Sequence, residues 1–283
     1  MTLPIRLLAI DIDGTLLNSS FAIDPRDLAA LRHVHSLGVE IILCTGRRHT
    51  FALPIAQELG FEVWLCSSNG AVTRSSGGEH FHRDLLPAFV ARELCEHLKE
   101  FRGSTVLTFD KTTKGALVLE RSDDMPPAVS KWMAKNAEYI EIVQPIEAAL
   151  SEDPVQAMIC GTPERIRTVE KVVSKFGGLE HITLLKTEYV NRDFSLLDVL
   201  NRDCSKGHAV ERWAKHRGIA REQVMAIGDN YNDVEMLQYA GVPVIMGNAC
   251  DTLKQNGWME THSNDECGVA AALERVMSTG KVN

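Results

Sequence analysis

At 283 residues the chain is longer than a typical single small domain, so we expect two lobes. Hydrophobic residues make up 45% of it and charged residues 24%, proportions that are close to those of soluble globular proteins and indicate neither disorder nor a fibrous repeat. The net charge of -8 and the lack of clustered Lys and Arg argue against nucleic acid as a partner, and no apolar run approaches the roughly 18 to 20 residues of a membrane-spanning helix.

The start of the chain does not have the pattern of a signal peptide. Pro4 and Arg6 interrupt the first apolar run, and Asp11 ends it. The seven cysteines are an odd number, are scattered along the chain and include no CxxC pair. We therefore expect reduced, mostly buried thiols and a cytoplasmic location.

The first 70 residues alternate between strand-like and helix-like patterns. Strands are expected at 7–10, 39–44 and 62–66, and helices at 25–37 and 50–59. Gly38 and Gly60 stand where the two helices end. This alternation predicts a parallel sheet with helices on both faces.

The pattern changes after Gly70 and the alternation returns near residue 193. In between, strand-like segments are expected at 78–84, 104–110, 115–120, 155–160 and 181–187, and helix-like segments at 87–101, 126–136 and 163–176. The alternation returns with strands at 194–200, 223–227 and 243–246 and helices at 206–217 and 232–239. We therefore predict an α/β protein with a doubly wound, Rossmann-like parallel-sheet core, residues 1–82 and 193–283, and an inserted α+β cap domain, residues 83–192.

Two carboxylates end the first predicted strand, in the segment Asp11-Ile12-Asp13-Gly14-Thr15. Asp11 and Asp13 are two positions apart on a strand, so their side chains share a face. This is the end of a parallel sheet where ligands bind. Close carboxylates repel each other unless a cation neutralises them, and their oxygens suit Mg²⁺. Seen alone, the segment also fits an acidic turn, whereas an EF-hand loop is excluded because Thr15 replaces a ligand and a strand comes first.

Thr45 and Gly46 follow the second predicted strand. A hydroxyl and a backbone N–H in this position form a small anion cradle. A plain turn between strand and helix is the alternative. Arg47 and Arg48 either add positive charge there or form the solvated start of a helix.

Two further strand ends supply charged residues. Lys206 begins a helix whose N-terminus favours an anion, with Ser205 as N-cap, although a surface lysine is the alternative. Asp229 and Asp233 lie in the segment 227–233, IGDNYND, where helix capping is the alternative. Together, four ends of one predicted sheet deliver a carboxylate, a hydroxyl or an ammonium to the same edge.

These four segments resemble the motifs of the haloacid dehalogenase-like superfamily: DIDGT, a Thr after the second strand, Lys206 and GDNYND. More narrowly, the chain is similar to the Cof-type sugar-phosphate phosphatases, in which a large α/β cap lies between the second and third motifs. The segments Ser68-Asn69-Gly70-Ala71 and Met246-Gly247-Asn248-Ala249 and the pair Gly268-Val269 match that family as well. The resemblance covers both halves of the core, while the cap matches in size and position.

The resemblance implies a role for each acidic residue. Asp11 attacks phosphorus and forms an aspartyl-phosphate, which water hydrolyses. Asp13 protonates the leaving alkoxide and then deprotonates that water. Mg²⁺ is held by Asp11, Asp229 and the backbone carbonyl of Asp13, with Asp233 in the outer shell.

The resemblance also implies residues that bind the phosphoryl oxygens: Thr45, Gly46, Lys206 and Asn232. Asn69 is implied as a supporting polar residue. The cap is expected to close over the site, to exclude water and to select the substrate.

We therefore expect a Mg²⁺-dependent phosphatase that hydrolyses a small phosphorylated metabolite. The alternatives are a sugar phosphomutase of related fold and a sugar-phosphate-binding protein without turnover, which would not need both Asp11 and Asp13. A P-loop kinase and a nicotinamide enzyme are disfavoured because GxxxxGK[ST] is absent and no GxGxxG follows a strand. The substrate stays open among sugar phosphates, other small phosphorylated metabolites and the phosphate of a flavin or pyridoxal cofactor, and the oligomeric state stays open too.

Overall fold

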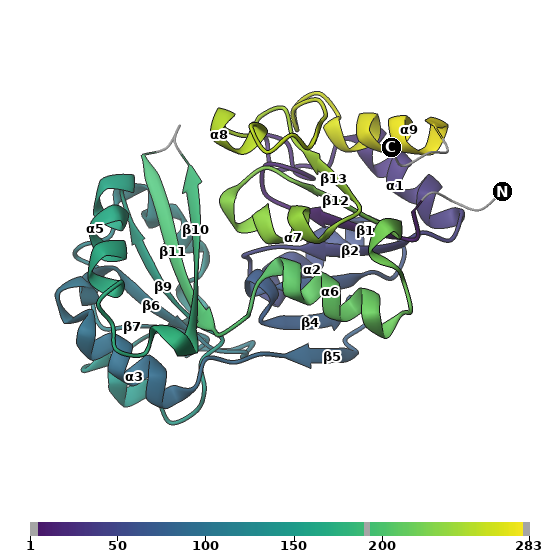
Figure 1. Cartoon of the computed structure of the whole chain (residues 1–283). Coiled ribbons are helices and arrows are strands. Elements are labelled where there is room, and N and C mark those ends of the chain that lie inside the picture. Colours follow the sequence, from purple (N-terminus) through teal and green to yellow (C-terminus); the bar gives the residue numbers. More distant parts are fainter. Residues whose placement is uncertain (1–4, 190–192, 280–283) are drawn as a thin grey trace. The chain divides into compact units, whose positions relative to one another are not determined.

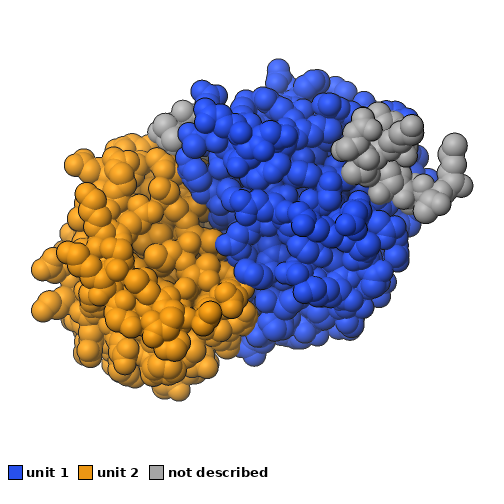
Figure 2. Space-filling view, in the orientation of Figure 1, with its two compact units in different colours: residues 1–83, 205–283 blue, residues 84–204 orange. Residues whose placement is uncertain are grey.

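The computed structural model describes residues 5–189 and 193–279, and the chain forms two compact units (Figures 1 and 2). Unit 1 consists of Met1–Arg83 and Ser205–Asn283, and unit 2 consists of Asp84–Cys204. The predicted end of the cap, residue 192, lies outside the described residues. Among the residues that are described, no helix combines the length and the apolar composition needed to cross a membrane.

Unit 1 is built on an eight-stranded sheet in the order β14-β13-β12-β1-β2-β3-β4-β5. Its strands are β1 Leu7–Asp11, β2 Glu40–Cys44, β3 Trp64–Ser67, β4 Val72–Ser75, β5 His80–Arg83, β12 Val224–Gly228, β13 Val242–Ile245 and β14 Met259–Glu260. The pairs from β14 to β3 are parallel, which confirms the predicted parallel core. The last two pairs, β3 with β4 and β4 with β5, are antiparallel, so the sheet is mixed at this edge.

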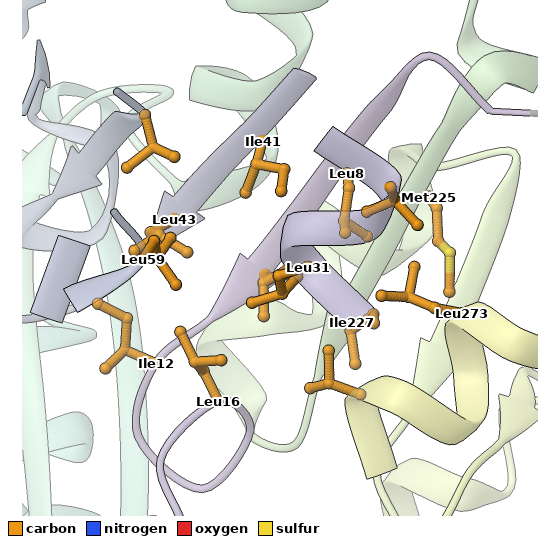
Figure 3. Packing of buried hydrophobic residues seen from close by; sticks show 14 of the residues in the cluster. Leu8, Ile12, Leu16, Leu31, Ile41, Leu43, Leu59, Met225, Ile227 and Leu273 are labelled. Atoms are coloured by element: carbon orange, nitrogen blue, oxygen red, sulfur yellow. The ribbon is translucent and has the colours of Figure 1, made fainter. Parts of the chain in front are cut away.

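Helices cover both faces of this sheet. One face carries α1 Pro25–Ser36, α2 His49–Glu58 and α9 Gly268–Thr279, and the other carries α6 Lys206–His216, α7 Val234–Tyr239 and α8 Asp251–Lys254. Side chains alternate along each strand, so Leu8 packs with the first group while Leu7 packs with the second. Figure 3 shows the first cluster, where Leu31 of α1 and Leu273 of α9 lie over Leu8 and Ile227. Burial on both faces explains why β1 is apolar up to Asp11.

Helices α1 and α6 of unit 1 each begin after a residue whose side chain caps the helix. The Asp24 side chain accepts from the backbone N–H of Arg26, and Pro25 opens α1 with its fixed φ. The Ser205 hydroxyl accepts from the backbone N–H of His208. The N-cap predicted from Ser205 is confirmed, and it fixes Lys206 at the first position of α6.

Unit 2 is built on a six-stranded sheet in the order β10-β11-β9-β6-β7-β8. Its strands are β6 Thr105–Thr108, β7 Leu117–Leu119, β8 Ile140–Ile142, β9 Gln156–Gly161, β10 Ile182–Tyr189 and β11 Phe194–Asn201. Its helices are α3 Ala88–His97, α4 Ser130–Lys135 and α5 Pro163–Val173. Helices α3 and α5 pack on one face of the sheet and α4 packs against the other. The predicted α+β character of the inserted region is confirmed.

The strand predicted at 194–200 exists, but its assignment to the parallel core is wrong. β11 pairs antiparallel with β10 and with β9, so it belongs to the sheet of unit 2. The compact units accordingly divide at Asp84 and Ser205. The physical reason is that a strand followed by a helix has the same local pattern in either sheet, since only the hydrogen-bonding partner distinguishes the two.

Candidate active site

Three neighbouring parallel strands of unit 1 end in polar residues. Asp11 is the last residue of β1, Thr45 follows β2, and Asp229 follows β12. Both β2 and β12 pair with β1, so the three ends lie next to one another. Lys206 reaches the same place from α6, although it is 195 positions from Asp11 in the sequence. The predicted convergence of strand ends is therefore present in the fold.

Lys206 lies between two carboxylates in the interior of unit 1. Its Nζ donates to Oδ1 of Asp11 at 2.5 Å and to Oδ1 of Asp233 at 2.7 Å. All three side chains are buried. Although burial alone lowers the pKa of an ammonium, the two facing carboxylates hold the pKa of Lys206 well above its ordinary value. Lys206 is thus a fixed internal cation, and the surface-lysine alternative is wrong.

The carboxylates of Asp11, Asp229 and Asp233 form a compact acidic cluster, in which each offers an oxygen within 4.8 Å of the others. Burial and then the charge of Asp233 raise the pKa of Asp11 to about 7, against the opposing effect of Lys206. Burial, followed by the charges of Asp11 and Asp233, raises the pKa of Asp229 well above its ordinary value. When all three carboxylates are ionised, they and the ammonium of Lys206 carry a formal charge of about -2. A divalent cation that prefers oxygen ligands fits both this charge and this donor set.

Asp233 uses both of its oxygens within this cluster. Oδ2 accepts from the backbone N–H groups of Asp229 and Asn230, each at 3.0 Å, while Oδ1 accepts from Lys206. A Cβ placed on Gly228 would lie 2.6 Å from Cβ of Asp233, so a larger residue would displace this turn. The side chain of Asp233 therefore orients Lys206 and the backbone around Asp229.

Asp13 forms a two-point ion pair with Arg47. Nε of Arg47 donates to Oδ2 of Asp13 at 2.7 Å, and Nη2 donates to Oδ1 at 2.5 Å. The backbone N–H of Arg47 donates to the hydroxyl of Thr45 at 3.0 Å, so the pair is built on the turn after β2. The sequence left two interpretations of Arg47 open: an added positive charge at the site, or the solvated start of a helix. The structure pairs Arg47 with Asp13. The sequence signal that could have indicated this role is the position of Arg47, two residues after Thr45.

The other predicted phosphate-binding residues meet at the ends of β2, β3 and β12. Nδ2 of Asn232 donates to Oδ1 of Asn69 at 2.9 Å, and the backbone N–H of Asn69 donates to the carbonyl of Thr45 at 2.9 Å. A Cβ on Gly46 would lie 3.3 Å from the amide of Asn69. Asn69 has a φ of 53°, in the left-handed region that Asn adopts more readily than most residues. Asn69, which the sequence indicates only as a supporting residue, thus links Thr45 to Asn232.

The haloacid dehalogenase-like hydrolase family matches residues 8–273, which include every one of these site residues. The chain belongs to this family. Among named relatives of this hydrolase, phosphatase YwpJ of Bacillus subtilis is 30% identical over 289 residues, covering 96% of this chain and 100% of that protein. Pyridoxal phosphate phosphatase YbhA of Escherichia coli is 28% identical over 266 residues, an alignment that covers 88% of this chain and 90% of that protein.

Solved structures agree with this assignment. A haloacid dehalogenase-like hydrolase from Bacteroides thetaiotaomicron matches with a TM-score of 0.76 and 28% identity, covering 96% of this chain and 99% of that one. The match includes the parallel-sheet core and the second sheet. The resemblance inferred from the motifs is confirmed, and this hydrolase is a phosphatase of the Cof type.

Proposed function

We propose that this hydrolase is a Mg²⁺-dependent phosphatase that acts on a small phosphate monoester, such as a sugar phosphate or a similar metabolite, through an aspartyl-phosphate. The main support is the buried contact of Lys206 with Asp11 and Asp233, with Asp229 beside them. A buried carboxylate, a fixed cation and a set of oxygens of the type that binds Mg²⁺ lie close together here, which supports the proposal.

Asp11 is the proposed nucleophile. Lys206 engages Oδ1, so we assign the attack on phosphorus to Oδ2. The bond from Oδ2 to phosphorus forms as the bond from phosphorus to the ester oxygen of the substrate breaks. Water then attacks the same phosphorus, the bond to Oδ2 breaks, and inorganic phosphate leaves. The ammonium of Lys206 stabilises charge on the phosphoryl oxygens in both steps.

Asp13 is the proposed general acid and base. It gives a proton to the leaving alkoxide in the first step and takes a proton from the attacking water in the second. Arg47 holds both carboxylate oxygens of Asp13 and so fixes the orientation of the group.

The magnesium ion would be held by Asp11, Asp229 and the backbone carbonyl of Asp13, with Asp233 in the outer shell. When bound, the magnesium ion would neutralise negative charge on the phosphoryl group. The oxygens of Asp233 already accept other hydrogen bonds, which supports its outer position. The hydroxyl of Thr15 donates to Oδ1 of Asp229 at 3.2 Å and orients that carboxylate.

The phosphoryl oxygens would be bound by the hydroxyl of Thr45, the backbone N–H of Gly46, the ammonium of Lys206 and the amide of Asn232. Asn69 holds the Asn232 amide and so supports this set. We assign substrate selection to unit 2 as the cap, and the phosphate of a pyridoxal cofactor is one candidate because a relative is named for it. The seven cysteines are free thiols, in keeping with the proposed cytoplasmic location.

The test is release of inorganic phosphate from a panel of phosphate esters, with Mg²⁺ and with EDTA. We expect turnover that EDTA abolishes and that Asp11→Asn lowers by at least about 1000-fold, the scale seen when a nucleophile is removed. Asp203→Asn, at a side chain that is 73% exposed, is the matched control and should be fully active. Equal hydrolysis by Asp11→Asn and wild type would refute the assignment, and a need for a bisphosphate activator would indicate a phosphomutase instead.

A further inference from the structure

The turn that follows Asp13 is bound by amide side chains from a distant part of unit 1. Nδ2 of Asn248 donates to the carbonyl of Gly14 at 2.8 Å. Nδ2 of Asn264 donates to the carbonyl of Leu17 at 2.9 Å. We refer to residues 14–20 as the Gly14 loop and to residues 246–265 as the brace segment. Two side-chain amides of the brace segment thus hold two carbonyls of the Gly14 loop.

Asn248 and Asn264 are also joined to each other, and a third contact lies beside them. The backbone N–H of Asn264 donates to Oδ1 of Asn248 at 3.0 Å, so one amide group receives a hydrogen bond and donates another. Oδ1 of Asp265 accepts from the backbone N–H of Ser19 at 2.8 Å. The Gly14 loop is therefore held at three successive points along its length.

The brace segment is itself fixed to the end of the sheet. The backbone N–H of Met246 donates to the carbonyl of Gly228 at 3.0 Å, and that of Thr261 donates to the carbonyl of Ile245 at 3.0 Å. Gly228 is the last residue of β12 and directly precedes Asp229. The segment that holds Gly14 is thus anchored to the strand that presents Asp229.

Gly14 occupies a position where small displacements matter. Its φ is 88°, and a Cβ there would lie 2.4 Å from Oδ2 of Asp229. The preceding residue is Asp13, and the following residue, Thr15, donates its hydroxyl to Asp229. The carbonyl that Asn248 holds therefore belongs to the peptide that joins Gly14 to Thr15.

We propose that Asn248 is a positioning residue for phosphoryl transfer. By holding the Gly14 carbonyl, it fixes the backbone between the proton donor Asp13 and the contact of Thr15 with Asp229. Asn248 is assigned no contact with the substrate and acts through Gly14. This inference rests on the proposed function, since Asp13 is the group being positioned.

The proposal predicts a large loss of rate with only a small loss of stability. The side chain of Asn248 makes two exposed hydrogen bonds, and each bond of this kind contributes only a small part of global stability. Misplacement of reacting groups by about 1 Å lowers a rate by as much as about 100-fold. The two effects are therefore separable in one variant.

The experiment compares Asn248→Ala and Asn248→Asp with wild type. The Asp variant keeps the acceptor for the Asn264 N–H but places an oxygen against the Gly14 carbonyl. Asn256→Ala is the control, because Nδ2 of this exposed residue donates to the carbonyl of Leu253 at 2.9 Å and does not contact the Gly14 loop. We expect kcat to fall by about 10- to 100-fold in both Asn248 variants, with KM within about twofold and Tm lowered by only a few degrees, while the control keeps full activity.

A second measurement does not depend on turnover. The backbone N–H groups of Leu16 and Leu17 donate to the carbonyls of Asp11 and Ile12 at 3.2 and 2.8 Å, so their hydrogen exchange reports on the order of the Gly14 loop. We expect exchange about tenfold faster in the Asn248 variants and unchanged in Asn256→Ala.

Two results would overturn the proposal: a kcat within twofold of wild type in both Asn248 variants, or exchange at Leu16 and Leu17 that does not change. If wild type releases no phosphate from any ester, the proposed function fails, and the exchange rates still decide whether Asn248 orders the loop.

Discussion

Asp11 and Asp13 are two residues apart on one strand end, yet their surroundings differ. The side chain of Asp11 is 6% exposed and contacts Lys206, whereas the side chain of Asp13 is 27% exposed and contacts Arg47. Two carboxylates in unlike environments are suited to unlike roles, one as nucleophile and one as acid and base. The distinction arises from their partners, because the two residues are chemically the same.

Asp13→Asn tests this division of roles. An amide neither gives nor takes a proton, so we expect kcat to fall by about 100- to 10,000-fold with an alkyl phosphate. With p-nitrophenyl phosphate the leaving phenolate needs no proton, so the first step should survive while hydrolysis of the phosphoenzyme slows. Stopped-flow absorbance should then record a burst of nitrophenolate close to one equivalent per enzyme. An equal loss for both substrates with no burst would assign the proton transfers to another group.

At the scale of elements, a buried carboxylate joins the first and last helices of unit 1. Oδ1 of Asp27, in α1, accepts from the backbone N–H of Ala270, in the first turn of α9, at 2.8 Å. Asp27 is 1% exposed, and its Oδ2 has no hydrogen-bond partner among the residues described. Burial raises the pKa of Asp27 to about 6, although the hydrogen bond from Ala270 opposes the shift.

This raised pKa predicts a pH dependence of stability. Ionising Asp27 is harder in the folded state than in the unfolded chain, so its contribution is most favourable below about pH 4 and is lost as the pH rises through about 6. Asp27→Asn keeps the acceptor for Ala270 and removes the charge. The free energy of urea unfolding of wild type, relative to Asp27→Asn, should therefore decline between pH 4 and 7.

Asp24→Asn is the matched control for this measurement. The backbone N–H of Arg26 holds the pKa of Asp24 below its usual range, so its contribution is present at neutral pH and is lost as the pH falls. The two variants should show opposite slopes over the acidic range. A wild-type advantage over Asp27→Asn that stays constant with pH would contradict the raised pKa of Asp27.

At the scale of the whole molecule, the two units have separate hydrophobic cores. In unit 1, buried residues of β1, β2 and β12 pack with α1, α2 and α9 on one face and with α6 and α7 on the other. Unit 2 has two described clusters. In one, α3 and α5 pack on one face of the sheet, and in the other, α4 packs on the opposite face. Each described cluster lies within one unit, and unit 2 is a continuous stretch of chain.

We therefore expect residues 84–204 to fold when produced alone. The isolated unit should give dispersed amide resonances and one cooperative unfolding transition in urea. It should release no phosphate, because Asp11, Lys206 and Asp229 all belong to unit 1. Collapsed resonances without a transition would mean that unit 2 depends on unit 1 for its stability.

The sequence by itself determined the parallel core, the inserted α+β region and the four segments that carry the site. These features follow from local patterns: apolar runs, helical spacing, caps and acidic residues at strand ends. Only the tertiary structure decided that β11 joins the sheet of unit 2, that Arg47 pairs with Asp13, and that Asn248 holds Gly14. Periodicity reports which face of an element is buried, whereas a hydrogen-bonding partner is chosen by residues far away in the chain, and no local pattern records that choice.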